Sequence, residues 1–338
     1  MKRYIYKQLL AWKNEKEHKP LILNGARQVG KTYILREFGR NEYKRMAFFS
    51  LDRDQKALEI FNKGGRATDM LMALSAICHE DITPHDTLVV LDEIQNCPKA
   101  LEALKFFCEE TPEIDIVVAG SLLGLSIHSG VSYPVGKVEE LHLYPMTFLE
   151  FLEAMGKTQL VNLLENKNWT VINMLETELI SSLRQYYYVG GMPAAVLAHI
   201  EKKGWKEVRR IQQQIITDYR RDFSKHAPTR EIPRINMVWD SIPAQLAKEN
   251  KKFVYGAVKK SARAADFEMA IQWLIDAGLA YKVPRVNAPR LPLKFYEDIS
   301  AFKLFMLDVG LMGAMAETTT ESVVVGDNIF SEYKGAFT

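Results

Sequence analysis

The 338-residue sequence predicts an α/β fold, a doubly wound parallel sheet sandwiched by helices. The main observation is that apolar, strand-like runs alternate with segments whose apolar residues recur at helical spacing. A second is the run Leu88–Leu91, an almost continuous branched apolar stretch that is typical of a strand buried on both faces of a parallel sheet. Ligands bind at the carboxyl ends of the strands in such sheets, and we expect the site there.

The elements of this fold are predicted in chain order. Residues 4–16 form an amphipathic helix through Ile5, Leu9 and Trp12. Apolar runs predict strands at 21–23, 45–51, 88–91, 114–120 and 138–143. Helices are predicted between them, beginning near Lys31, over about 70–78, and from Pro98, a residue favoured early in helices.

The second half of the chain is predicted to be mainly helical. Residues 148–226 show few strand signals, and Gly190–Pro193 predicts a turn between helices. Residues 231–283 predict a unit of short helices, then a helix at 264–277 and a short strand at 280–283. Pro284, Pro289 and Pro292 mark a loop region, and a last strand is predicted at 302–307, before Asp308.

Composition limits the function classes. Lys and Arg total 44 against 42 Asp and Glu, so the formal charge of +2 does not single out nucleic acid or an acidic substrate. Cys78, Cys97 and Cys108 lack the spacing of a disulfide set or a zinc site. The N-terminus has no signal-peptide core, and no apolar run reaches the ~20 residues that cross a bilayer. We therefore expect a cytoplasmic protein with no membrane partner.

One stretch has the spacing of a phosphate-binding loop, G-x-x-x-x-G-K-[ST]. It consists of Gly25, Ala26, Arg27, Gln28, Val29, Gly30, Lys31 and Thr32. Glycines let consecutive backbone N–H groups point at a phosphate chain, and the following helix adds its partly positive N-terminus. Lys31 is expected to reach the β- and γ-phosphates, and the Thr32 hydroxyl to bind Mg²⁺. The preceding strand and following helix favour ATP binding over an ordinary strand-to-helix turn.

Asp92 and Glu93 follow the predicted strand that begins at Leu88, with Asp92 sixty positions after Thr32. Asp92 is expected to hold Mg²⁺ through water, opposite Thr32. Glu93 is placed to orient or deprotonate an attacking water, which favours a hydrolase over a kinase. Lys31 and Glu93 are therefore the candidate catalytic residues. The alternative is an acidic pair that ends a strand and caps the next helix.

Ser121 directly follows the predicted strand 114–120 and lies on the same sheet edge as Asp92. Its hydroxyl is expected to touch the γ-phosphate or the attacking water; the alternative is a simple turn serine. Gln95 and Asn96 are assigned to the cap of the next helix. Arg27 is either exposed or in contact with a neighbour or with the rest of the chain.

These motifs together resemble a known family. Gly25–Thr32, Leu91–Gln95, Gly120-Ser121 and Leu141–Phe151 resemble prokaryotic AAA-type ATPases that are related to archaeal ATPases and carry a winged-helix domain and a C-terminal nuclease-like domain of unknown function. Gly190–Pro193 and Phe305–Leu311 match further landmarks, so the resemblance covers essentially the whole chain.

The resemblance implies four parts. They are an additional-strand P-loop ATPase domain at 1–150, a helical lid at 151–230, a winged-helix-like domain at 231–285, and the start of the nuclease-like domain at 286–338. It also implies that Lys31 and Thr32 bind phosphates and Mg²⁺, that Asp92 and Glu93 form the second nucleotide motif, and that Ser121 is a sensor.

Two departures from the family pattern stand out. Lys137 follows Gly136 where arginine is expected, which removes the support for an arginine finger there. The sequence ends at Gly335–Thr338, where the family continues into its nuclease-like core, so we expect a truncated polypeptide.

A basic segment at 248–263 suits the phosphates of double-stranded DNA. Six basic residues against Glu249 give it a local charge of +5; they are Lys248, Lys251, Lys252, Lys259, Lys260 and Arg263. The helix at 264–277 opposes this role, because it carries three acidic residues and no basic one. The alternative is a protein-docking or structural role.

Arg220 and Arg221, beside Asp218 and Asp222, predict a solvated helix face. The alternative is an arginine that completes the site of a neighbouring copy in a homo-oligomer.

The sequence as a whole predicts an ATPase in which Mg²⁺-dependent ATP binding and hydrolysis drive a conformational change, acting on or recruited to DNA. The rival hypothesis is a nucleotide-state switch that turns over slowly and recruits a protein partner. A small-molecule P-loop kinase is disfavoured by Glu93 and by the added domains.

Overall fold

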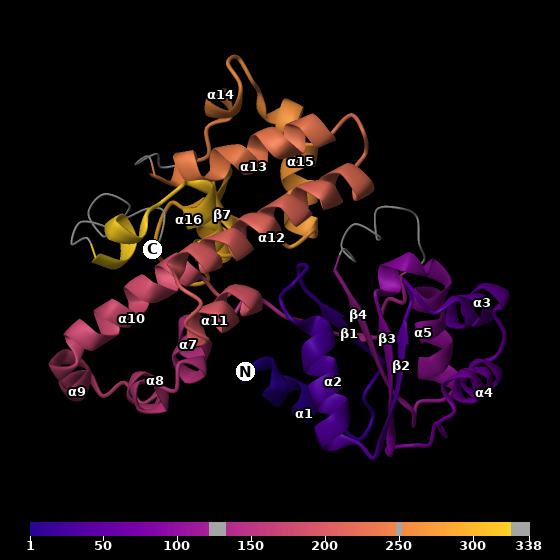
Figure 1. The fold of residues 1–338 in the computed structure, drawn as a ribbon. Coiled ribbons are helices and arrows are strands. Elements are labelled where there is room, and N and C mark those ends of the chain that lie inside the picture. The colour runs from indigo at the N-terminus through magenta and orange to yellow at the C-terminus, as the bar shows by residue number, and fades with distance from the viewer. Residues whose placement is uncertain (122–132, 248–251, 326–338) are drawn as a thin grey trace. The chain divides into compact units, whose positions relative to one another are not determined.

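The computed structural model describes residues 1–121, 133–247 and 252–325 (Figure 1). The chain divides into two compact units, one from Lys2 to Tyr144 and one from Pro145 onward. Lys248, Lys251 and the chain end, Gly335–Thr338, lie outside the described residues.

The first unit is a five-stranded parallel sheet between two layers of helices (Figure 1). The strands are β1 (Leu21–Asn24), β2 (Arg45–Ser50), β3 (Thr87–Asp92), β4 (Asp115–Gly120) and β5 (Glu139–His142). One face carries α1 (Ile5–Asn14) and α2 (Lys31–Glu42), and the other carries α3 (Gln55–Lys63), α4 (Ala67–Cys78) and α5 (Pro98–Glu110). The predicted α/β fold is confirmed.

The strand order, β2-β3-β4-β1-β5, places β4 between β1 and β3. Asn24 at the end of β1 pairs with Gly120 of β4, and Leu91 of β3 pairs with Val118. The residues that follow, Asp92 and Ser121, therefore emerge at the edge of the sheet where the loop after β1 begins. This inserted strand is the additional strand that the resemblance implied.

Burial explains why these runs became strands. Every residue of β3 and of β4 is buried, as expected for the centre of a sheet covered on both faces. Phe49, Phe61 and Phe107 form part of the core between the sheet and α3–α5. Ile5, Leu9 and Trp12 are buried on α1, as predicted.

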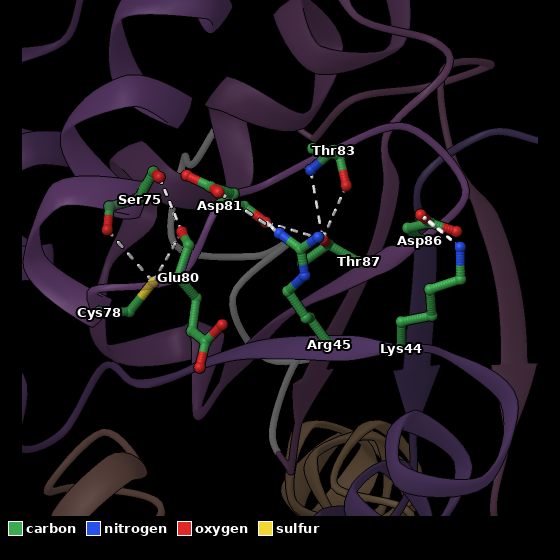
Figure 2. A network of polar contacts seen from close by, with 9 residues as sticks. All are labelled: Lys44, Arg45, Ser75, Cys78, Glu80, Asp81, Thr83, Asp86 and Thr87. Carbon is green, nitrogen blue, oxygen red and sulfur yellow. Dashed lines mark hydrogen bonds and ion pairs between the residues drawn. The ribbon is translucent and has the colours of Figure 1, made fainter.

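The opposite, amino edge of the sheet is closed by a polar network around the loop between α4 and β3 (Figure 2). Thr87 Oγ1 donates a hydrogen bond to the Asp81 carbonyl oxygen at 2.9 Å, and Arg45 donates to the same oxygen at 3.3 Å. Lys44 forms an ion pair with Asp86 at 2.9 Å. Thr83 N–H also donates to Thr87 Oγ1 at 3.2 Å, so the contacts around Thr87 hold this loop against the first residues of β2 and β3.

The second unit is mainly helical. Its first helices are α7 (Phe148–Ala154), α8 (Thr158–Glu165), α9 (Trp169–Met174), α10 (Glu176–Val189), α11 (Pro193–Ile200) and α12 (Trp205–His226). They are followed by α13 (Ile232–Ala247), α14 (Tyr255–Val258), α15 (Ala264–Asp276), β6 (Ala280–Val286), β7 (Glu297–Met306) and α16 (Val309–Met315). Short helical turns occur at Leu293–Tyr296 and Glu321–Val325.

Two predicted elements are corrected by tertiary packing. Short helices were expected after residue 231, but the first of them, α13, is 16 residues long and contains Pro243. Burial of Ile235, Trp239 and Ile242 stabilises this helix by more than the proline destabilises it. The strand expected at 280–283 continues through Pro284 to Val286. Pro284 borders a register shift, where a missing N–H disturbs the ladder least.

The strand β7 pairs antiparallel with β6 along 280–286. It begins at Glu297, five residues earlier than predicted, because this pairing extends beyond its apolar part. The expected domain boundary at 285 falls inside this two-stranded sheet. The winged-helix and nuclease-like identities of these residues stay predictions.

A buried junction joins distant segments of the second unit at Asp308. Gly191 N–H donates to Asp308 Oδ2 at 2.6 Å, and Leu311 N–H donates to Oδ1 at 2.9 Å. A Cβ on Gly190, whose φ is +72°, would lie 2.2 Å from Oδ1. Burial raises the pKa of Asp308 to about 6, although its backbone hydrogen bonds favour the charged form. The predicted turn between α10 and α11 is confirmed, and it also receives this carboxylate.

Candidate functional site

The loop from Gly25 to Gly30 joins β1 to α2 at the carboxyl edge of the sheet. A Cβ at Gly25 would lie 2.3 Å from the Leu143 carbonyl oxygen, so only glycine fits beside the chain that follows β5. Gly30 caps α2 with φ +99°, a left-handed conformation that glycine adopts without strain. The sequence therefore builds a tight turn that ends in a helix N-terminus, which is where anions bind.

Lys31 is the first residue of α2, and its side chain is buried inside the loop. Its ammonium donates to the carbonyl oxygens of Gly25 at 2.8 Å and Ala26 at 2.9 Å. Burial lowers the pKa of Lys31 to about 8, while Glu93 and Asp92 act in the opposite direction. The loop thus holds a desolvated cation at the position predicted to meet phosphate.

Arg3 anchors the loop and was missed by sequence reasoning. Its guanidinium donates to the carbonyl oxygens of Val29 at 2.9 Å and Tyr144 at 2.6 Å. The side chain is only 7% exposed, so these contacts fix the end of the loop from within the protein. No local signal distinguishes Arg3 from its solvated neighbours, because both of its partners are distant in sequence.

Thr32 and Asp92 meet across the inserted strand β4. The Thr32 hydroxyl donates to Asp92 Oδ2 at 2.6 Å, and Glu93 N–H donates to Oδ1 at 3.1 Å. Burial raises the pKa of Asp92, and the hydrogen bond from Thr32 opposes that shift. A hydroxyl and a carboxylate in contact are the oxygen ligands that Mg²⁺ prefers, so these residues fit the expected metal.

Glu93 follows β3 in a left-handed backbone conformation, with φ +57°. The amide nitrogen of Gln95 donates to Glu93 Oε2. We expected Gln95 and Asn96 to cap α5, and this prediction was wrong. The cap residue is Cys97, and Gln95 and Asn96 belong to a short helical turn, Ile94–Asn96, that precedes the helix. Gln95 instead faces Glu93, a role that a capping pattern cannot reveal.

Ser121 is only 4% exposed at the end of β4. Its Oγ and the Oε1 of Gln95 are buried, and neither has a hydrogen-bond partner within the described part of the chain. Buried polar groups in proteins are nearly always hydrogen-bonded, so orphan atoms require an explanation. Both lie on segments that leave the carboxyl ends of strands, where the nucleotide is expected.

The remaining predicted residues lie apart from this cluster or at its rim. Arg27 is half-buried and Gln28 is exposed. Lys137 forms an exposed ion pair with Glu109 at 2.9 Å. The cation at this position is therefore already paired with an acidic residue of α5.

The arginines of α12 lie in the second unit. Arg220 pairs with Asp240 at 2.6 Å, and Arg221 with Asp218 at 3.1 Å; both arginine side chains are exposed, which confirms the solvated face. Asp222 departs from that prediction, because it is buried. Their role in a neighbouring copy stays a prediction.

Within 1–121, 133–247 and 252–325, no three His, Cys, Asp or Glu side chains gather as a metal site would require. None of the helices in these ranges combines the length and apolarity needed to span a bilayer.

Residues 17–152 match the family model of the AAA domain. Residues 180–322 match a second family model, described as a domain of unknown function (DUF8612). The comparison with curated proteins gives no match.

Similar solved structures include the Walker-type ATPase PABY2304 of Pyrococcus abyssi, at 14% identity and a TM-score of 0.58, covering 93% of this chain and 95% of that one. Cdc6p from Pyrobaculum aerophilum matches at 14% identity over 96% of both chains, with a TM-score of 0.32. AMPPCP-bound DnaA from Aquifex aeolicus matches at 15% identity, with a TM-score of 0.32, over 80% of this chain and 86% of that one. The first of these shows a shared fold, and the lower scores carry no further argument.

The family match and the sheet topology agree on the first unit. Its five parallel strands, with β4 inserted beside the loop strand, form the α/β fold of P-loop nucleoside triphosphatases. The findings support a P-loop ATPase domain of the AAA type.

Proposed function

We propose that the first unit binds ATP with Mg²⁺ and hydrolyses it at the carboxyl edge of β1, β3 and β4. One observation carries the proposal: the buried ammonium of Lys31 and the Thr32–Asp92 pair occupy one edge, although sixty residues separate Thr32 from Asp92. A strand-to-helix turn needs neither a desolvated cation nor a carboxylate brought from a distant strand.

Each group then has a role that follows from its chemistry. The backbone N–H groups of Gly25–Thr32 bind phosphate oxygens, and Lys31 exchanges the carbonyl oxygens of Gly25 and Ala26 for the β- and γ-phosphates. Thr32 and Asp92 hold Mg²⁺, which neutralises charge on the phosphate oxygens when bound. Glu93 accepts a proton from the attacking water, and Ser121 donates to the γ-phosphate or to that water.

We propose that ATP hydrolysis drives a conformational change that acts through the second unit. Its element order, three helices α13–α15 followed by the antiparallel pair β6–β7, supports a winged-helix domain. Lys252, Lys259, Lys260 and Arg263 are exposed, which supports contact with phosphates of double-stranded DNA. The exposed face of α15 carries Asp266 and Glu268, so the contact falls to the segment before the helix.

The slow switch that recruits a protein partner is the second candidate. The observation that favours it is a set of exposed apolar side chains in the connection between β6 and β7 and at the start of β7: Leu291, Phe295 and Ile299 are 87%, 83% and 80% exposed. Exposed apolar side chains that form a contiguous patch mark protein interaction sites.

Steady-state ATP hydrolysis by the wild type and Glu93→Gln, with and without duplex DNA, tests the proposal. We expect the wild type to turn over and Glu93→Gln to bind ATP with at least a ~100-fold lower kcat, because the amide accepts no proton. Glu59→Gln, which makes the same change on an exposed face of α3, is the matched control.

The outcomes separate the candidates. Turnover that DNA stimulates supports a DNA-coupled ATPase. A wild type that binds ATP but hydrolyses it no faster than Glu93→Gln rejects the ATPase and leaves the switch.

A further inference from the structure

Gln95 lies two residues after Glu93, on the helical turn Ile94–Asn96. Its Nε2 donates to Glu93 Oε2. An ionised carboxylate only accepts hydrogen bonds, so the amide must turn its N–H group toward Glu93 and its oxygen away. The orientation of this amide therefore follows from the chemistry of its partner.

The contact fixes a carboxylate that the backbone has already aimed. Glu93 has φ +57°, a strained conformation for a residue with a side chain, and Ile94 beside it is fully buried. The hydrogen bond occupies Oε2 of Glu93. No hydrogen bond to Oε1 occurs among the described residues, so that oxygen can take a proton.

The other half of the amide is the second observation. Gln95 Oε1 is buried and unpartnered among the residues that the structure describes. Its turn packs against β4, which ends beside the equally unpartnered Ser121 Oγ. Most buried side-chain polar atoms have a hydrogen-bond partner, so the open acceptor of Gln95 requires an explanation. Gln95 Oε1 can therefore accept a hydrogen bond from a group that enters the site with the substrate, beside the candidate base Glu93.

We infer that Gln95 is a positioning residue: it holds one oxygen of Glu93 through its N–H group, leaves the other to act on water, and offers Oε1 to a donor that enters with ATP. This inference rests on the proposed hydrolysis at Glu93. It extends that proposal, because it names the residue that sets the direction of the carboxylate.

Gln95→Met tests the inference, since it keeps the length of the side chain but removes the donor. We expect kcat for ATP to fall at least ~10-fold while KM changes less than ~2-fold. Asn96→Ala, at the exposed next position, is the matched control.

Gln95→Glu sharpens the test, because it places an acceptor where Glu93 needs a donor. It should lower kcat at least as far as Gln95→Met, while KM for ATP again changes less than ~2-fold. A residue that only supports the fold would not change kcat separately from KM.

Three outcomes would overturn the inference, and they are distinguishable. If Glu93→Gln is inactive but Gln95→Met matches Asn96→Ala in kcat and KM, Gln95 does not position Glu93 and the proposed function stands. If Gln95→Met loses ATP binding together with kcat, its role is structural. If the wild type itself does not hydrolyse ATP, the proposed function fails and the inference fails with it.

Discussion

Two buried aspartates follow apolar strands in this chain, and their surroundings differ. Asp92 ends β3 and Asp308 follows β7; their exposed fractions are 5% and 4%. Asp308 accepts hydrogen bonds from the backbone N–H groups of Gly191, Leu311 and Gly310, and Gly190 packs against its carboxylate. Asp92 accepts from the hydroxyl of Thr32 and from one backbone N–H.

The difference separates a group that holds the fold from a group that can exchange partners. Backbone donors cannot leave Asp308 without moving α10, α11 or α16. The Thr32 hydroxyl can turn from Asp92 to a metal ion by rotating one side-chain bond. A buried carboxylate at a strand end is thus no evidence of a site; the identity of its donors decides.

The largest expected effect is on the second unit. Asp308→Ala leaves three buried N–H groups unsatisfied, and we expect the free energy of unfolding to fall by about 3 kcal/mol or more. Asp240→Ala, which removes an exposed ion pair with Arg220, should cost less than about 1 kcal/mol. Denaturant titrations of both variants measure this. Equal losses would mean that the junction does not depend on the carboxylate.

Asp92→Asn should show the reverse pattern. We expect kcat for ATP to fall at least ~100-fold, because an amide is a poor Mg²⁺ ligand, whereas the free energy of unfolding should change by less than about 1 kcal/mol. Burial raises the pKa of Asp92, so a neutral side chain relieves a desolvation cost. Parallel hydrolysis assays and denaturant titrations check both halves. A variant that unfolds as readily as Asp308→Ala would remove the distinction between the two aspartates.

The smallest effect concerns the pH dependence of ATP binding. The pKa of Lys31 is lowered to about 8 by burial, and bound phosphates would raise it again. Binding must then take up a proton above pH 8, so affinity should fall as the pH rises, by about tenfold at pH 9. Calorimetric titrations between pH 7.5 and 9 measure both the affinity and the proton uptake.

Lys31→Gln provides the control for this prediction, since any affinity that it keeps should lack this pH dependence. A wild-type affinity that stays constant up to pH 9 would show that Lys31 remains charged without nucleotide.

Features that depend on residues close together in the sequence could be predicted from the sequence alone. The loop Gly25–Thr32, the strand before Asp92 and the position of Ser121 are recognisable because spacing and apolar runs determine them. The predicted end of β6 at residue 283 was wrong. Pro284 indicated a loop, but a proline is tolerated in a strand beside a register shift.

Contacts between distant segments explain the residues that were missed. Arg3 contacts Val29 and Tyr144, and no local signal at residue 3 indicates this. Gln95 fits a helix-cap pattern, and only the left-handed turn at Glu93 brings its amide to the carboxylate. The carboxylate of Asp308 is enclosed by Gly190 and Gly191, which lie more than a hundred positions away in the sequence.

A crystal structure with Mg²⁺ and a non-hydrolysable ATP analogue would show whether the carboxyl edge of β1, β3 and β4 exchanges internal hydrogen bonds for nucleotide. We expect Lys31 to leave the carbonyl oxygens of Gly25 and Ala26 for the phosphates and Thr32 to leave Asp92 for Mg²⁺. We also expect Ser121 and Gln95 to gain partners while Asp308 keeps its own. A nucleotide bound elsewhere, or bound with these hydrogen bonds intact, would contradict the proposed exchange.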